Sequence, residues 1–282
     1  MESPWLHRYV VLLAACALVL IVSGASVTNA LMATPTSASA GFLSEPLHRV
    51  GGEGMLMLTF VLAGYLRTDP RRWLRVFGWV AFAVLLIDAN FGNPGVLQLA
   101  PRAFGILHAC LAQLFLSSLV AIAVFTSRGW QRGPDPVQDQ GWPSLRSLSI
   151  LTPLLVLSQV TLGAALRHRS LSVTPHIISA MIVAFMVLAV GVFVTQQFPD
   201  HRSLRPAAIA LMGITLAQVF LGIAALTMRM VGEENALPVK LSTAAHVTTG
   251  ALTLASSVVL GILIQRHVRA AAAEPAIALD VR

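Results

Sequence analysis

Residues 175–196 read PHIISAMIVAFMVLAVGVFVTQ. The stretch is long enough to cross a bilayer core, which takes roughly 20 helical residues, and its only ionisable side chain is that of His176, just inside the start. Similar apolar runs recur along the chain. They predict an all-α membrane protein with eight transmembrane helices, at 9–31, 47–66, 73–92, 103–126, 148–167, 175–196, 205–227 and 243–265.

The composition agrees with this class. Of the 282 residues, 56% are hydrophobic and only 11% are charged, whereas a soluble domain carries about 25% charged residues. The first run is too long for the apolar part of a signal peptide, so we interpret it as a retained helix. The segment before Arg8 is too short for an organellar transit peptide, which favours a bacterial plasma membrane. Cys16 and Cys110 both fall inside predicted spans, which argues against a disulfide framework.

The positive charges indicate an orientation. Thirteen of the nineteen Lys and Arg residues fall on the side that holds both termini, and six fall on the other. Short loops rich in Lys and Arg stay in the cytoplasm, so we predict that both termini are cytoplasmic. The net charge of +7 then reflects membrane topology, and a nucleic-acid partner is not expected.

Four histidines share one place in this pattern, because each lies just inside the start of every second apolar run. They are His48, His108, His176 and His246. In the predicted orientation all four lie near the outer face of the membrane. Neutral imidazole is a common metal ligand, and two facing histidines can hold a haem iron from both sides. Two such pairs predict a redox or haem-modifying protein. We expect the other histidines at the cytoplasmic ends, His7, His201 and His267, to be solvated.

The chain divides into two similar halves. Residues 128–147 are rich in Gly, Pro, Gln and Asp, a linker composition. We predict a four-helix bundle over residues 1–127, a cytoplasmic linker over 128–147, a second four-helix bundle over 148–266 and a cytoplasmic tail over 267–282. Because each half has four helices, the halves share an orientation and form a parallel repeat.

A second signature recurs in the helices that precede the histidines. A polar residue stands four positions before a glycine, which puts both on one helix face. The pairs are Asp88 and Gly92, Gln159 and Gly163, and Gln218 and Gly222. The glycine would let a backbone or a flat ring approach closely, or it would serve ordinary helix packing.

Glu45 distinguishes the first half from the second. It lies three residues before His48 and therefore shares its helix face, and no glutamate stands at the corresponding place before His176 or His246. The residue either opens the helix, as acidic residues near Pro46 often do, or acts as an acid/base group beside the ligand that His48 holds.

Four further residues are candidates at the outer rim. Arg49 and Arg102 would pair with anionic haem propionates or extend to the membrane interface. Asp88 would hydrogen-bond a ligating imidazole or be solvated at a helix end. His168, between two arginines in an outer loop, would meet a cofactor edge or be exposed.

With these motifs the whole chain resembles the haem A synthase family. The features that carry the resemblance are eight helices in paired halves, a histidine opening each even helix, the Glu45-Pro-Leu-His-Arg49 motif, and the stretch from Gln159 to His168. The resemblance implies oxidation of the C8 methyl of haem O to a formyl group, which gives haem A for terminal oxidases. It also implies that His48 and His108 hold the substrate haem, that His176 and His246 hold a resident haem b, and that Glu45 is catalytic.

The implied partners are haem O, haem O synthase, a terminal oxidase or its assembly factors, membrane lipid and a further copy of the chain. A second function stays open from the residues themselves. Two bis-histidine sites would also suit a diheme electron carrier or an oxidase-assembly subunit without haem-modifying activity.

Overall fold

The computed structural model describes residues 4–31, 44–139, 142–232 and 236–269. Helices dominate these ranges. The elements are α1 (Pro4–Leu31), α2 (Ser44–Leu66), α3 (Arg72–Phe91), α4 (Pro94–Leu97), α5 (Pro101–Thr126), α6 (Arg128–Gln131), β1 (Val137–Gln138), α7 (Leu145–Arg167), α8 (Val173–Gln197), α9 (Leu204–Val231), α10 (Leu237–His267) and β2 (Val268–Arg269). Each predicted span coincides with one long helix, and the all-α class is confirmed.

Seven helices in the described ranges are long and apolar enough to cross a membrane, namely α1, α3, α5, α7, α8, α9 and α10. These helices indicate a multi-pass membrane protein. Among the long helices, the one that does not meet this criterion is α2, which carries Glu45, Arg49 and Glu53 in its first three turns. Its crossing stays a prediction, although it packs alongside α1 and α3.

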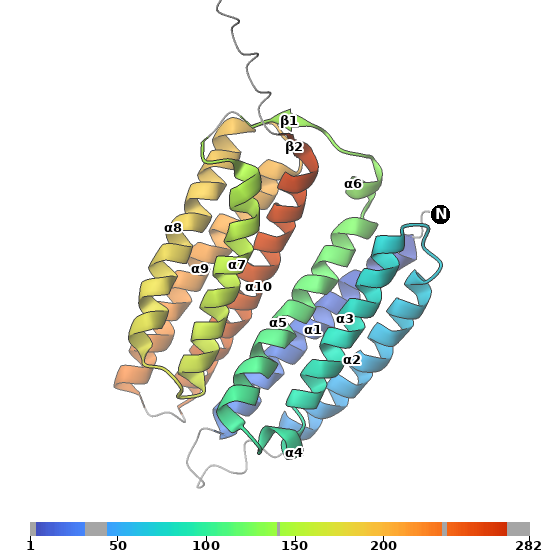
Figure 1. Cartoon of the computed structure of the whole chain (residues 1–282). Coiled ribbons are helices and arrows are strands. Elements are labelled where there is room, and N and C mark those ends of the chain that lie inside the picture. Colours follow the sequence, from blue (N-terminus) through green and yellow to red (C-terminus); the bar gives the residue numbers. More distant parts are fainter. Residues whose placement is uncertain (1–3, 32–43, 140–141, 233–235, 270–282) are drawn as a thin grey trace, which may run out of the picture.

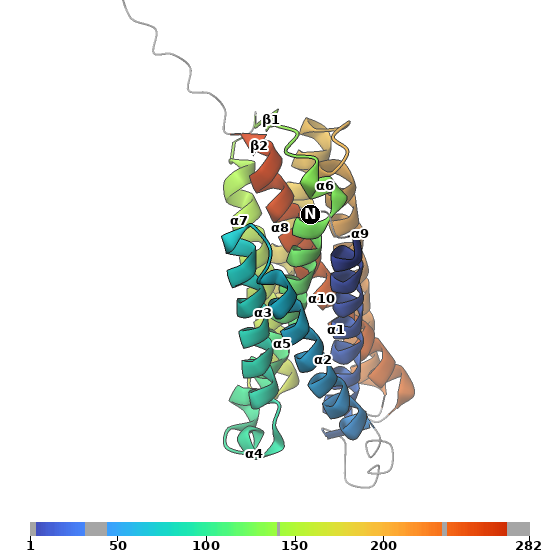
Figure 2. The same cartoon turned by 90° about the vertical axis from the view of Figure 1, so that its right-hand side faces the viewer.

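The long helices form two groups that run side by side (Figures 1 and 2). The first group consists of α1, α2, α3 and α5, and the second of α7 to α10. The groups meet where α10 packs against α5 and α1, and where α7 packs against α5. The first described residue and the end of α10 lie at one end of the molecule, the upper end in Figure 1. We call this the terminal end and the opposite one the histidine end, because α2, α5, α8 and α10 begin there.

Each group has its own hydrophobic core. Leu13, Leu62 and Leu119 are buried in the first, and Val187 and Leu211 in the second. Inside a membrane the alternative to burial is contact with equally apolar lipid, so these side chains stabilise the helix groups through close packing. The two cores fix the helices on which the histidines sit.

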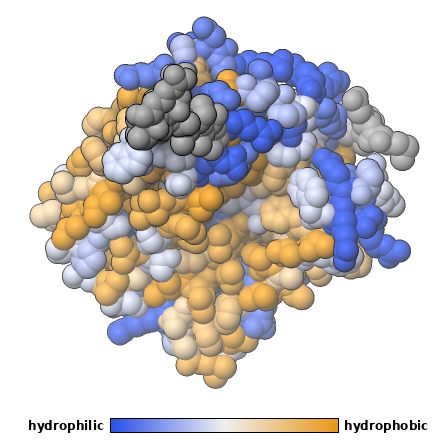
Figure 3. Space-filling view, turned by 45° about the horizontal axis from the view of Figure 1, so that its top comes forward, coloured by the Kyte–Doolittle hydropathy of each residue, from blue (hydrophilic) through white to orange (hydrophobic). Residues whose placement is uncertain are grey.

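The outer sides of the helices are apolar. Met181 and Phe185 on α8 are 70% and 74% exposed, which suits contact with lipid rather than with water. Figure 3 shows hydrophobic residues over the sides and hydrophilic residues gathered at the terminal end. This distribution agrees with a protein that crosses a membrane.

The segment predicted as a linker is packed against the second group of helices. It contains α6 and β1, and β1 pairs in parallel with β2, Val137 opposite Val268. The tail predicted from residue 267 therefore begins with a helical residue and a short strand. Residues 270–282 lie outside the described residues.

The prediction of solvated histidines at this end was wrong. His201 and His267 are only 8% and 5% exposed, and their ring centroids are 4.8 Å apart. His7 is partly buried, with Nδ1 3.0 Å from the carbonyl oxygen of Ala123. Asp135 lies between His201 and His267. Its backbone N–H donates to His267 Nδ1 at 2.9 Å, and its carbonyl oxygen lies 3.2 Å from His201 Nε2. The pair anchors the linker.

His201 also caps α9. Its Nδ1 accepts hydrogen bonds from the backbone N–H groups of Ser203, at 3.3 Å, and Leu204, at 3.2 Å. The first N–H groups of a helix have no partner within the helix, so the ring replaces the side-chain oxygen that usually serves there.

We therefore expect His201→Ala to loosen both the linker and the start of α9. Losing a cap typically costs about 1 kcal/mol, so trypsin should cleave after Arg128 or Arg132 several times faster than in the parent protein. The measurement is the cleavage rate of the purified protein in detergent. Asp200→Ala, a neighbouring exposed position, is the control. Equal rates in all three proteins would show that His201 does not hold the linker.

Candidate functional site

The four histidines form two pairs, one within each helix group. His48 on α2 faces His108 on α5, and His176 on α8 faces His246 on α10. In both pairs the ring centroids are 6.2 Å apart and the ring planes meet at 88°. All four side chains are half-buried. The repeat seen in the sequence therefore extends to the geometry of the site.

The spacing of each pair fits a metal held between the rings. A metal–nitrogen bond is about 2 Å long and an imidazole nitrogen lies about 1 Å from its ring centroid, which puts two coordinating rings about 6 Å apart. No group of three or more His, Cys, Asp or Glu side chains that could hold a metal occurs within the described residues. A bare metal ion usually needs three or four protein ligands, whereas a haem iron needs only two axial ones. The pairs therefore suit haem better than a bare ion.

In the first pair, Nδ1 of each ring is turned toward the preceding helix. Ser23 donates to the carbonyl oxygen of Leu20 at 2.9 Å, so its Oγ accepts from His48 Nδ1 at 2.7 Å. His108 Nδ1 lies 3.0 Å from the carbonyl oxygen of Asp88 and 2.9 Å from its carboxylate Oδ1. With a hydrogen on Nδ1, each ring keeps Nε2 free as a ligand.

The second pair has neutral partners in the same places. His246 Nδ1 lies 3.2 Å from the carbonyl oxygen of Gln218, and the side-chain Nε2 of Gln159 lies 3.1 Å from His176 Nδ1. The Oε1 atoms of both glutamines are buried and have no partner within the described ranges. The same Nε2 of Gln159 donates to the backbone carbonyl oxygen of His176 at 3.0 Å, which fixes the amide against α8.

A glycine on the preceding helix lies against each histidine ring. A methyl group added at these glycines would come within 2.8 to 3.0 Å of the ring. The contacts are Gly24 with His48, Gly92 with His108, Gly163 with His176, and Gly222 with His246. The predicted role of the glycines, the close approach of a flat ring, is confirmed. The copy in α1 was missed because Leu20 stands where the other copies have a polar residue, although Ser23-Gly24 was a visible signal.

Asp88 belongs to the first pair rather than to a solvated helix end. Its side chain is 5% exposed and it lies in the last turn of α3, one turn before Gly92. The hydrogen-bond partner of His108 Nδ1 is the carbonyl oxygen of Asp88, and the carboxylate lies beside the ring without a hydrogen bond of its own to Oδ1 among the described residues.

Residues of the second half reach the first pair. The ring of His168, which ends α7, packs against Gly105 of α5, where an added methyl would lie 2.4 Å from the ring. Gly105 stands one turn before His108 on the same helix. Arg167 donates to the carbonyl oxygen of Ala25 on α1, next to Gly24. Sequence reasoning placed His168 only in an outer loop and had no signal for the contact made by Arg167.

The remaining candidates lie at the starts of their helices. Glu45 is in the first turn of α2, one turn before His48 and partly buried. Arg49 and Arg102 are exposed, in the second turn of α2 and the first turn of α5. The positions of the two arginines suit both pairing with haem propionates and extension to the membrane interface.

The site thus defines a class, a multi-pass helical membrane protein with two equivalent histidine pairs suited to haem. No family model matches the chain. A protein named heme A synthase from an Exiguobacterium species is 27% identical to it over 136 residues, which is 48% of this chain and 44% of that protein. The matched region thus spans less than half of that relative. The similarity supports the resemblance to the haem A synthase family.

We expect the glycine contacts to be required for haem retention. Gly222→Ala brings a methyl within 2.9 Å of His246 and should displace the ring, so that most of the second-half haem is lost on purification. The measurement is the haem content per chain from the optical spectrum.

Gly213→Ala is the matched control. It lies on the same helix, α9, and an added methyl there meets nothing within 4 Å. Alanine is favoured over glycine within a helix by about 0.5–1 kcal/mol, so this variant should keep its haem. Equal haem contents in the two variants would contradict the proposed role of Gly222.

Proposed function

We propose that the protein oxidises the C8 methyl of haem O to a formyl group and so produces haem A. The observation that carries the proposal is the contrast between two histidine pairs of equal geometry. Among the described residues, carboxylates lie close only to the first pair, with Asp88 against His108 and Glu45 one turn before His48. The similarity to a protein named heme A synthase supports the same conclusion.

In this proposal His48 and His108 bind the substrate haem and set its position. Asp88 holds the Nδ1 hydrogen of His108 and keeps the ring turned toward the substrate. Ser23 does the same for His48. Fixed rings hold the reacting methyl in one place relative to the protein, which is how positioning contributes to catalysis.

Glu45 is the proposed acid/base residue. Oxidation of a methyl to a formyl group releases protons as well as electrons, and a nearby carboxylate can accept those protons or stabilise developing positive charge. Glu45 shares a helix face with His48, so it projects toward the same ligand. Arg49 and Arg102, at the starts of the same two helices, are proposed partners of the haem propionates.

His176 and His246 would hold a resident haem b. When bound, this group supplies one-electron redox chemistry. Gln159 and Gln218, which lie against its two histidines, are neutral, and no glutamate stands three residues before His176 or His246. The contacts of Arg167 and His168 with α1 and α5 keep the two sites next to each other.

The proposed setting is a bacterial plasma membrane. The terminal end, with its arginines, would be cytoplasmic and the histidine end would face outward. The product would pass to a terminal oxidase or its assembly factors.

A diheme electron carrier is the second candidate. The equal geometry of the two pairs favours it, because both irons would be fully coordinated and alike. The two candidates differ in whether a haem is chemically changed, which the following variants test.

We expect Glu45→Gln to bind haem but to stop at haem O or at a hydroxylated intermediate. Glutamine keeps the shape of glutamate and removes its charge. The protein is expressed in cells that make haem O but no haem A, and extracted haems are separated by chromatography. Glu53→Gln, exposed on the same helix, should still give haem A. If Glu45→Gln gives haem A at the parent rate, Glu45 serves only as a helix-start residue. If the parent protein gives none and still binds two haems, the electron-carrier function is supported instead.

We expect the double variant His176→Ala/His246→Ala to lose the low-spin haem b signal, because both axial ligands are gone. The first pair should still bind haem O, since its helices have a separate core. The matched double variant is His48→Ala/His108→Ala, which should keep haem b and lose haem O. Full haem b content in the first double variant would refute the assignment of the ligands.

A further inference from the structure

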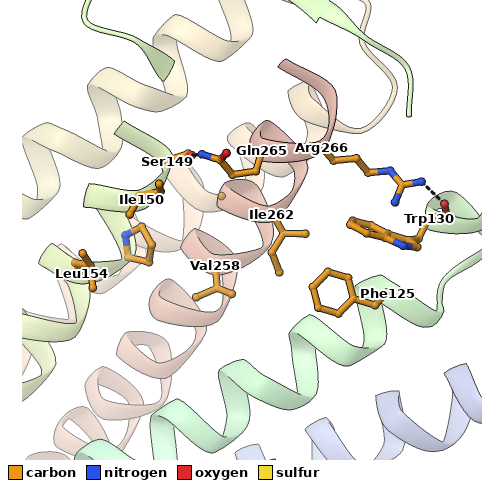
Figure 4. Close-up of a pocket in the computed structure, with 11 residues that line it drawn as sticks. Phe125, Trp130, Ser149, Ile150, Leu154, Val258, Ile262, Gln265 and Arg266 are labelled. Atoms are coloured by element: carbon orange, nitrogen blue, oxygen red, sulfur yellow. Dashed lines mark hydrogen bonds between the residues drawn. The ribbon is translucent and has the colours of Figure 1, made fainter. Parts of the chain in front are cut away.

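A groove lies between the two helix groups near the terminal end, and nothing in the proposed haem chemistry uses it (Figure 4). Its volume is about 550 Å³, within the range of about 300–1,000 Å³ typical of ligand pockets. Its walls come from the end of α5, from α6, from the first half of α7 and from the last turns of α10.

The walls of the groove are apolar and lie within membrane-spanning helices. Ile150 and Leu154 of α7 face it from one side and Val258 and Ile262 of α10 from another. Ile150 and Leu154 are each 57% exposed. Hydrocarbon chains are the occupants that such walls favour inside a membrane.

The polar groups at the closed side of the groove are already satisfied within the protein. The side-chain amide of Gln265 donates to the carbonyl oxygen of Arg146 at 2.8 Å and to Ser149 Oγ at 2.9 Å. Gly261 lets the carbonyl of Ser149 approach α10, since an added methyl would lie 2.8 Å from that oxygen. The walls therefore give a polar ligand little to bind.

Arg266 differs from the rest of the lining. Its guanidinium lies over the ring of Trp130, 3.6 Å from the ring centroid, and donates to the carbonyl oxygen of Trp130 (Figure 4). Its Nε is buried and has no hydrogen-bond partner among the described residues. No ion pair with a carboxylate is recorded for it in the described ranges. Stacking fixes the cation at the mouth of the groove, and no carboxylate within the described ranges pairs with it.

An apolar groove with a fixed arginine at its mouth matches the two parts of a phospholipid. Basic pockets between transmembrane helices on the cytoplasmic side bind the head groups of anionic lipids, and guanidinium groups bind phosphate through charge-assisted hydrogen bonds. We propose that this groove is a binding site for an anionic phospholipid. The phosphate lies at Arg266, and one acyl chain lies along Ile150, Leu154, Val258 and Ile262. The proposal depends on the membrane placement of the helices and not on the haem reaction.

The test measures lipid retention. The full-length protein is reconstituted in nanodiscs that contain equal amounts of phosphatidylglycerol and phosphatidylcholine with the same acyl chains, and bound lipids are counted by native mass spectrometry. The parent protein should retain phosphatidylglycerol in preference to phosphatidylcholine. Arg266→Gln should lower its retention about tenfold, as expected for loss of one charge-assisted hydrogen bond.

Two further variants make the result specific. Arg205→Gln removes a charge from an exposed position at the same end, outside the groove, and should leave retention unchanged. Ile150→Trp fills the groove with Arg266 in place and should lower retention of phosphatidylglycerol. It also decides the matter if Arg266→Gln does not fold. Equal retention of the two lipids by the parent protein, equal losses in Arg205→Gln and Arg266→Gln, or unchanged retention in Ile150→Trp would overturn the proposal.

Discussion

The structure depends on holding two imidazole rings about 6 Å apart across a helix group, with a fixed tilt between them. Free histidine side chains would rotate, and the rotation would separate the ligand nitrogens. Here a glycine permits close contact behind each ring, and Nδ1 of His48, His108 and His246 lies within hydrogen-bond distance of an oxygen on the preceding helix. The preceding helix thus determines which way the following histidine faces. This explains why the helices alternate, with positioning residues on odd spans and ligands on even spans.

Both halves hold a histidine pair against glycines of the preceding helices, but the polar residues beside the rings differ. In the second half the described residues that lie against the Nδ1 atoms, Gln159 and Gln218, are neutral. In the first half, Asp88 contacts His108 and Glu45 stands one turn before His48. Carboxylates inside a membrane are costly unless they have a function or a partner. The asymmetry is the physical basis for assigning substrate to the first pair.

Much of this could be predicted from sequence. The helices were found because each apolar run is long and ends near arginines, and the pairs were found because His48, His108, His176 and His246 recur at equal places. The structure gave what local pattern could not. Asp135, His201 and His267 come together from three distant segments, whereas the sequence predicted solvated histidines. The contacts of Arg167 and His168 with the first half likewise depend on how α7 packs against α1 and α5, which periodicity does not specify.

The central proposal is that each histidine pair, whose ring planes meet at 88°, would hold a haem. Electron paramagnetic resonance of the oxidised, purified protein tests this most directly, because the shape of a low-spin haem signal depends on the angle between its axial imidazoles. With both pairs at 88°, we expect strongly anisotropic low-spin signals from two haems per chain. A high-spin signal, or the rhombic signal of parallel imidazole rings, would contradict the account.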